Sequence, residues 1–203
     1  MKKIAVVAFL MAIAVAGYSQ AQVAIGIKAG PNFAKINADE SASANYKNRT
    51  GFHGGAFALF KLTKIGIQPE LLFSQQGSTV EVNGTDLEAN YNYINIPILL
   101  KLYLAAGFNL QAGPQIGFVS KAEVENFVNG TSGATTMTDV KDQLKGNDVS
   151  LALGAGWDLP FGLTIDARYN LGLSEVYDFA NSPEAKNQVF QLSVGFKLIK
   201  LGK

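Results

Sequence analysis

Apolar and polar residues alternate along most of the chain with a period of two. The clearest case is residues 162–173, GLTIDARYNLGL, where apolar side chains such as Ile165 take every second place. Asp166 and Arg168 lie between them. A period of two is typical of a β-strand whose two faces meet different surroundings. Here one face is wholly apolar and the other carries two full charges.

Seven other segments show the same alternation. The eight segments are 23–36, 51–62, 65–76, 91–104, 108–119, 148–159, 162–173 and 188–198. Each has 11 to 14 residues, whereas a strand of a globular protein usually has about five or six. A tilted strand that crosses a membrane needs about 9 to 11 residues. The lengths therefore favour eight membrane-spanning strands.

The connections between these segments alternate between short and long. The short ones are Thr63-Lys64, Ala105-Ala106-Gly107 and Pro160-Phe161-Gly162. They predict hairpin turns and hence antiparallel neighbours. The long ones are 37–50, 77–90, 121–147 and 174–187, which are expected to be polar loops. Short turns on the periplasmic side and long loops outside are typical of outer-membrane barrels.

The two faces of the segments fit a closed barrel in lipid. Strands can span a bilayer only as a closed barrel, because every backbone polar group must be paired. The apolar faces of the eight segments contain no Lys, Arg, Asp or Glu, as hydrocarbon requires. The sequence thus predicts an all-β fold, an eight-stranded antiparallel up-and-down transmembrane β-barrel in the outer membrane. A soluble lipocalin-like barrel is the main alternative, but it would need an apolar interior.

The first residues are expected to be a cleavable signal peptide. Lys2 and Lys3 precede an apolar run that ends near Gly17, and small and polar residues follow. This run is too short for a transmembrane helix, which takes about 20 residues, and the order is that of a secretory signal. We expect residues 1–21 to be removed and residues 22–203 to form the barrel domain.

Composition excludes several functions. A formal net charge of +1 argues against nucleic-acid binding. The absence of Cys excludes disulfides, thiolate metal sites and a Cys nucleophile. The single histidine, His53, has no motif partner in the sequence. We therefore expect neither an enzyme nor a bound cofactor or metal.

The polar faces point into the lumen, which eight strands leave just wide enough for side chains to fill. The candidate site is a charge network of five inward residues: Lys28, Glu70, Lys101, Asp166 and Arg168. Buried charges must be paired, because unpaired ones are very costly. We expect a structural plug of salt bridges. The alternative is that the same charges form a gate or a ligand site.

Five stretches carry a resemblance to a known family. They are GIKAGPNFA, IQPELLFSQQG, YINIPILLKLYL, LQAGPQIGF and LTIDARYNLGL. The chain, over about residues 23–198, resembles the small outer-membrane β-barrels of Gram-negative bacteria called porin-family or PorT-like. The resemblance implies an eight-stranded barrel with Glu70, Lys101 and Arg168 facing inward, and it implies no catalytic residues.

Three functions remain open. The first is a structural or surface-interaction role through the long extracellular loops, above a filled lumen. The second is a porin-like channel for small solutes. The third is an accessory role in a secretion or surface-assembly system, as the resemblance to PorT-like proteins implies. The expected partners are outer-membrane lipid, the barrel-assembly machinery and a surface or secretion-system protein that contacts the loops.

Overall fold

The computed structural model describes residues 21–38, 45–47, 49–82, 85–127, 135–139, 146–175 and 185–202. Within these ranges there are ten strands: β1 (Ala21–Ala38), β2 (Asn45–Lys47), β3 (Arg49–Leu62), β4 (Ile65–Val82), β5 (Thr85–Tyr103), β6 (Phe108–Phe127), β7 (Thr135–Asp139), β8 (Asn147–Asp158), β9 (Leu163–Glu175) and β10 (Ala185–Leu201). No helix in the described part is long and apolar enough to cross a membrane. The predicted signal peptide falls almost entirely on residues 1–20, outside the described ranges.

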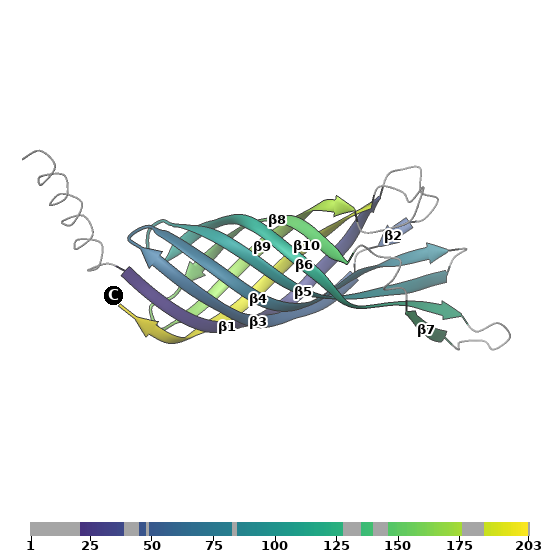
Figure 1. The fold of residues 1–203 in the computed structure, drawn as a ribbon, viewed down its shortest axis with the longest axis horizontal. Helices are drawn as coiled ribbons and strands as arrows, with labels where there is room; N and C mark the ends of the chain where they lie inside the picture. The colour runs from purple at the N-terminus through teal and green to yellow at the C-terminus, as the bar shows by residue number, and fades with distance from the viewer. Residues whose placement is uncertain are drawn as a thin grey trace, which may run out of the picture.

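Eight long strands close into a barrel. Around the barrel the order is β1, β3, β4, β5, β6, β8, β9 and β10, and every neighbouring pair is antiparallel. The first and last strands complete the circle, with Phe33 opposite Phe190 and Ile27 opposite Phe196 (Figure 1). The predicted eight-stranded antiparallel barrel is confirmed. Closure pairs the backbone groups of every long strand on both sides, as lipid requires.

The three predicted hairpin turns are present at one end of the barrel. Ala106 and Gly107 take positive φ values of 54° and 84° between β5 and β6, and Gly162 has a φ of 101° before β9. A side chain at Gly107 would also overlap the carbonyl oxygen of Asp158. Glycine is therefore required at position 107 on two counts. Both ends of the barrel domain, Ala21 and Leu201, lie at this same end (Figure 1).

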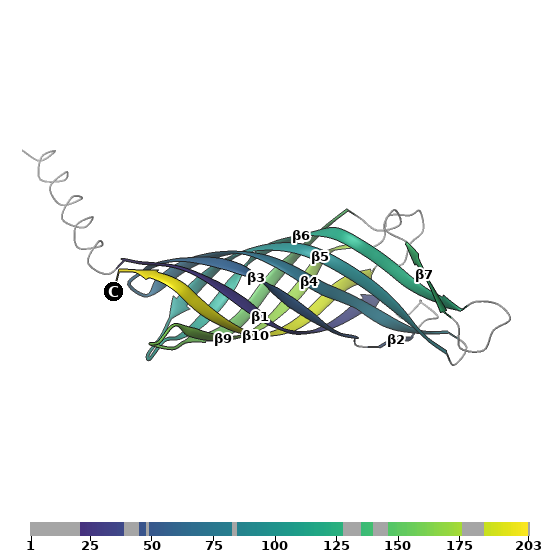
Figure 2. The same ribbon diagram turned by 90° about the horizontal axis from the view of Figure 1, so that it is seen from below.

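The other end differs from the prediction of long polar loops. The expected loop 77–90 is mostly strand, since β4 continues to Val82 and β5 starts at Thr85, with Val80 opposite Leu87. The expected loop 121–147 likewise contains the end of β6 and all of β7. β2 pairs with β4 and β7 with β6, so a sheet continues beyond the barrel wall (Figures 1 and 2). The period-two signal is lost in these stretches because a strand outside the membrane is not required to keep one face apolar.

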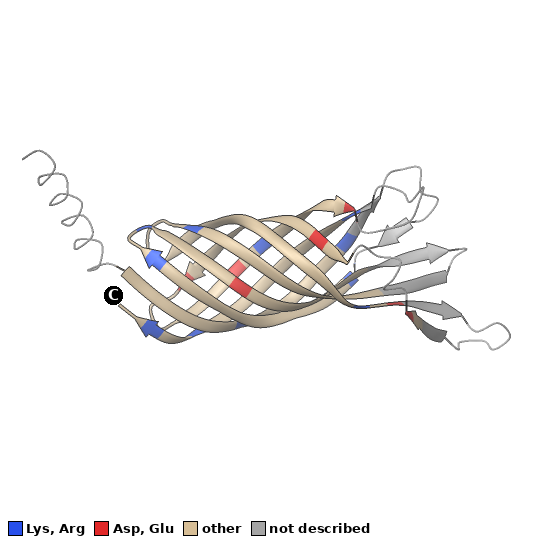
Figure 3. Ribbon diagram, viewed as in Figure 1, with Lys and Arg blue, Asp and Glu red and all other residues tan. Residues whose placement is uncertain are grey.

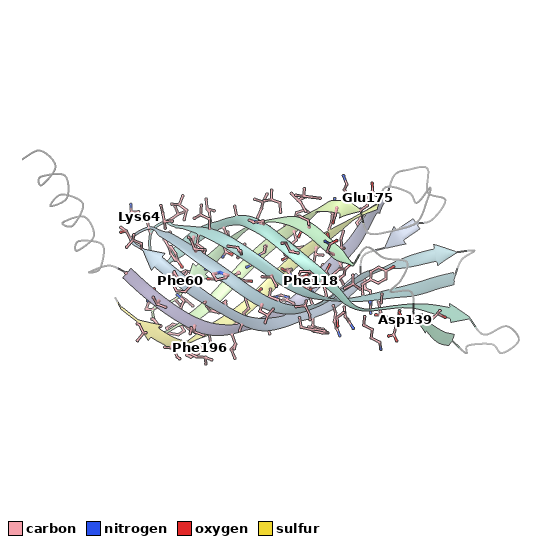
Figure 4. All side chains as sticks on the ribbon, in the orientation of Figure 1. Phe60, Lys64, Phe118, Asp139, Glu175 and Phe196 are labelled. Atoms are coloured by element: carbon pink, nitrogen blue, oxygen red, sulfur yellow. The ribbon has the colours of Figure 1, made fainter. Side chains whose placement is uncertain are left out.

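Apolar side chains cover the outside of the barrel between its two ends (Figure 4). Residues such as Ile67, Ile98 and Val194 are about half exposed. Exposed charged side chains of the described residues, such as Lys64, Lys121 and Lys200, lie towards one end of the barrel or the other, outside the apolar band. The predicted lipid-facing and lumen-facing sets are thus observed. From its place near a strand end, Tyr91 is expected to belong to a band of aromatic side chains on the outer surface. In the structure Tyr91 is instead buried and faces the lumen with Tyr93. The reason is strand parity, since Tyr91 has the parity of the lumen-facing residues of β5.

Candidate functional site in the barrel lumen

The five predicted site residues meet in the middle of the lumen. Lys28 comes from β1, Glu70 from β4, Lys101 from β5, and Asp166 and Arg168 from β9. All five are at least 97% buried. Strand parity explains their direction, since each is flanked by residues that face lipid. Charged side chains from strands far apart in the sequence thus lie close together (Figure 3).

The strongest contact joins Glu70 and Arg168. The two terminal guanidinium nitrogens of Arg168 donate to Glu70 Oε1 and Oε2, each at 2.9 Å. Glu70 Oε1 also accepts from Gln68 Nε2 at 2.7 Å and from Lys28 Nζ at 3.2 Å. A bidentate arginine–carboxylate pair has a fixed geometry and is among the stronger side-chain contacts in proteins. Glu70 therefore binds β4, β1 and β9 together.

Asp166 is the second carboxylate of the network. Lys28 Nζ lies 2.7 Å from Asp166 Oδ2, and Gln111 Nε2 donates to Asp166 Oδ1. Lys101 Nζ is 4.0 Å from the same Oδ1 atom. Lys28 therefore bridges Glu70 and Asp166, and Lys101 continues the network towards the turn end.

A third carboxylate, Asp158 of β8, completes the network near the turns. Lys101 Nζ lies 3.2 Å from Asp158 Oδ1, and Lys197 Nζ lies 2.7 Å from Asp158 Oδ2. The Tyr103 hydroxyl donates to Oδ2 at 2.8 Å, and Asn109 Nδ2 to Oδ1 at 3.3 Å. Asp158 and Lys197 have the parity of lumen-facing residues in their segments, but the sequence alone does not connect them to the site.

Glycines on the inner wall make room for these groups. A side chain at Gly156 would overlap Asp166 Oδ1 and Gln111 Nε2. A side chain at Gly195 would lie 2.6 Å from Thr164 Oγ1 and 3.0 Å from Lys28 Cβ. The glycine positions of β8 and β10 therefore allow the long charged side chains to cross the lumen.

The network brings together four cations and three carboxylates. The cations are Lys28, Lys101, Arg168 and Lys197, and the carboxylates are Glu70, Asp158 and Asp166. Each carboxylate contacts at least two of the cations. Such an arrangement can fill and cross-link the lumen, because the charges compensate one another where water is scarce.

A layer of polar side chains without formal charge lies above the charge network. It is nearer the extended end, the end of the barrel where β4, β5 and β6 continue beyond the wall. His53 Nε2 is 2.8 Å from Ser193 Oγ, and His53 Nδ1 is 2.7 Å from Asn32 Oδ1. The order Ser, His, Asn is that of a nucleophile, a base and an orienting group. However, all three residues are buried, and Asn32 Oδ1 also accepts from Gln191 Nε2 at 3.0 Å. The three side chains therefore form part of a wider hydrogen-bond layer, which the sequence pattern did not reveal.

Some buried polar atoms in the lumen lack a protein partner. In the described part of the chain these are Asn95 Nδ2, Gln115 Oε1, Arg168 Nε, Asn170 Oδ1 and Asn187 Oδ1. Four of the five belong to the neutral layers above the charge network, where Asn187 also donates to Gln76 Oε1. Fewer buried polar atoms thus lack a hydrogen-bond partner in the charge network than in the half of the lumen nearer the extended end.

A comparison with solved structures found several similar chains. Neisserial surface protein A superposes with a TM-score of 0.53 at 11% identity, covering 86% of this chain and 97% of its own. The attachment invasion locus protein Ail of Yersinia pestis gives a TM-score of 0.49 at 14% identity, with coverages of 90% and 99%. OprG of Pseudomonas aeruginosa gives 0.43 at 12% identity, with coverages of 92% and 99%. A comparison with curated proteins found no matching sequence.

A family model provides the assignment that these distant structural likenesses cannot. The model for the outer membrane protein beta-barrel domain matches residues 18–178, well over half of the chain. The finer resemblance to PorT-like barrels stays a prediction. The matched range takes in the barrel strands from β1 to β9, whose exposed side chains between the two ends of the barrel are apolar. The chain therefore belongs to the outer membrane protein β-barrel domain family and is a transmembrane protein of the outer membrane.

Proposed function

We propose that the protein is a non-conducting barrel that anchors a protruding β-sheet outside the cell, and that this sheet is an interaction surface. The supporting observation is the length of three strands. β4, β5 and β6 each extend nine residues past Phe73, Ile94 and Phe118, which are exposed apolar side chains near the end of the described outer wall. At about 3.3 Å per residue, nine residues correspond to about 30 Å of strand. That length is not needed to cross lipid.

The charge network supports the non-conducting part of the proposal. A solute that crosses the lumen would have to separate Glu70 from Arg168 and Asp158 from Lys197, both of which are buried pairs. Separating such a pair leaves a charge without compensation, which costs about 3–5 kcal/mol. The apolar side chains of Leu59, Leu72 and Leu99 are also fully buried and fill part of the lumen.

The protruding sheet has the properties of a binding platform. Its described strands lie in the order β2, β4, β5, β6, β7, and they continue directly from the barrel wall. A surface carried by a rigid scaffold is where binding function usually lies. Paired strands also hold such a surface in one shape, which lowers the entropy lost on binding.

Crosslinking in intact cells tests the interaction part. The chain has no Cys, so Thr138→Cys, at an exposed position of β7, can carry a single photo-crosslinker. Val194→Cys on the lipid-facing wall is the matched control. We expect discrete crosslinked products from position 138 and none of the same size from position 194. Identical products at both positions, or none at position 138, would contradict the proposal.

A gated pore for small solutes is the second candidate. It is favoured by the unpaired polar atoms of Asn95, Gln115, Asn170 and Asn187, which fit a water-accessible outer half of the lumen. Single-barrel recordings in a planar bilayer separate the two candidates. We expect no stable conductance steps from the native chain. Reproducible steps that disappear in the heat-denatured sample would favour the pore.

A further inference from the structure

Among the described residues, the turn end of the barrel carries an unbalanced positive charge. Lys64 and Lys200 are exposed there, and Lys61 is partly exposed (Figure 3). The carboxylate described at this end, Asp158, is buried and held by Lys101 and Lys197. The described part of this rim therefore presents ammonium groups and no exposed carboxylate.

The three lysines differ in how far they are engaged. The Lys61 ammonium lies 3.9 Å from the centre of the Tyr103 ring, and Lys200 Nζ donates to the carbonyl oxygen of Pro160 at 3.1 Å. Within the described chain, the Lys64 ammonium has no protein partner; only its backbone carbonyl is used, by the Tyr103 amide at 2.7 Å. Lys64 is thus the cation on this rim that is free to bind something else.

An apolar groove of about 550 Å³ lies directly beside Lys64. Its lining residues are Phe60, Leu62, Thr63, Lys64, Ile65 and Ile67. The four apolar side chains are each about half exposed and belong to the ends of β3 and β4, where they face lipid. Figure 4 shows Lys64 and Phe60 at the same end of the barrel. The groove thus opens between the hydrocarbon and the turn that carries the free ammonium.

We propose that this groove binds an anionic glycerophospholipid of the periplasmic leaflet. One acyl chain lies along Phe60 and Ile67, and the headgroup phosphate contacts the Lys64 ammonium. Lysine suits this position because its methylene stem packs on apolar surface while its charge reaches the headgroups. Lipid is the occupant because the groove is part of the lipid-facing wall of an outer-membrane barrel. The proposal places the short turns in the periplasm and is independent of any role for the extracellular sheet.

Native mass spectrometry of the refolded mature chain in detergent tests the site. The probes are phosphatidylglycerol and phosphatidylethanolamine with identical acyl chains. We expect tighter binding of phosphatidylglycerol, and we expect Lys64→Gln to weaken it about five-fold, the effect of one lysine beside an anionic lipid surface. Phosphatidylethanolamine binding should not change. Lys35→Gln, an exposed lysine near the other end of the barrel, is the matched control and should leave both affinities unchanged.

A second variant separates the groove from simple surface charge. Ile67→Ala shortens one wall of the groove and should weaken both lipids alike, with the preference for phosphatidylglycerol kept. Equal effects of Lys64→Gln and Lys35→Gln would overturn the proposal. So would competition by glycerol phosphate as effective as that of the intact lipid, since the site would then be one for soluble anions. Unboiled gel mobility of each variant shows that the barrel is folded.

Discussion

Glu70→Gln removes the carboxylate that binds three strands together. Glu70 accepts two hydrogen bonds from Arg168, one from Lys28 and one from Gln68, and its side chain is fully buried. Glutamine keeps the shape but presents an NH₂ group to cations on at least one side. Arg168 then keeps at most one of its two hydrogen bonds to residue 70, through the amide oxygen, and a long contact of 3.4 Å to Gln111. The network would then contain four cations and only two carboxylates.

The expected cost is about 3–5 kcal/mol, the range for a buried pair that loses one partner. Glu123→Gln provides a matched control, since Glu123 lies 2.8 Å from Lys121 with both side chains partly exposed. An exposed pair contributes at most about 1 kcal/mol. The same chemical change in the same chain should thus differ several-fold in effect, because only one of the two carboxylates is buried.

Urea unfolding in lipid vesicles can measure both variants. Trp157 is the only tryptophan and stacks on Phe108 with ring centres 4.7 Å apart, so its fluorescence follows the barrel. With a slope of about 2 kcal/mol per molar urea, Glu70→Gln should lower the midpoint by about 2 M. Equal midpoints for the two variants would refute the view that the lumen charges hold the barrel together.

A double variant tests the reason for the loss. Glu70→Leu with Arg168→Met removes one charge of each sign, so the balance of the network is unchanged, and Lys28 keeps Asp166. Replacing a buried pair by apolar residues of similar volume is often neutral or stabilising. The double variant should therefore be more stable than Glu70→Gln. If it is less stable, the pair contributes through its own contacts and not through charge compensation.

Other variants test the inner wall and the outer wall. Gly156→Ala should destabilise the barrel by about 1–3 kcal/mol, because its side chain overlaps Gln111, whereas Gly54→Ala finds its nearest atoms at 3.7 Å and should be tolerated in the same urea assay. Ile165→Lys on the lipid-facing wall should cost about 2–4 kcal/mol, and Leu201→Lys at the interface about 1 kcal/mol or less. A similar loss for the two lysine variants, measured as the free energy of unfolding in vesicles, would argue against the lipid-facing assignment.

The membrane part of the fold could be predicted from the sequence because lipid imposes a rule on every second residue. Ile165 and Tyr169 face out and Asp166 and Arg168 face in for the same reason, strand parity, and this rule holds in all eight long strands. The inward direction of Lys28, Glu70 and Lys101 follows from parity too. Their contacts do not, since parity gives the face of a strand but neither the strand order nor the stagger between strands.

The parts that escaped prediction are those where the rule stops. Beyond Phe73 on β4 no hydrocarbon demands an apolar face, so the sequence loses its alternation although the backbone pairing continues to Val82. The link between His53 and Ser193 joins residues 140 positions apart across the lumen. No local spacing encodes such a contact; only the closure of β1 on β10 brings it about.

Closure of the barrel also explains why the interior needs charges at all. Eight strands leave a lumen that side chains from opposite walls must fill, and fully buried leucines such as Leu59, Leu72 and Leu99 fill only part of it. Long side chains with charged ends can meet at the centre, and each pair of opposite charges fixes the stagger of the two strands that carry it. Glu70 and Arg168 set β4 against β9 in this way, although the two strands are not neighbours. The charge network therefore adds cross-links that backbone pairing, which joins only neighbours, cannot provide.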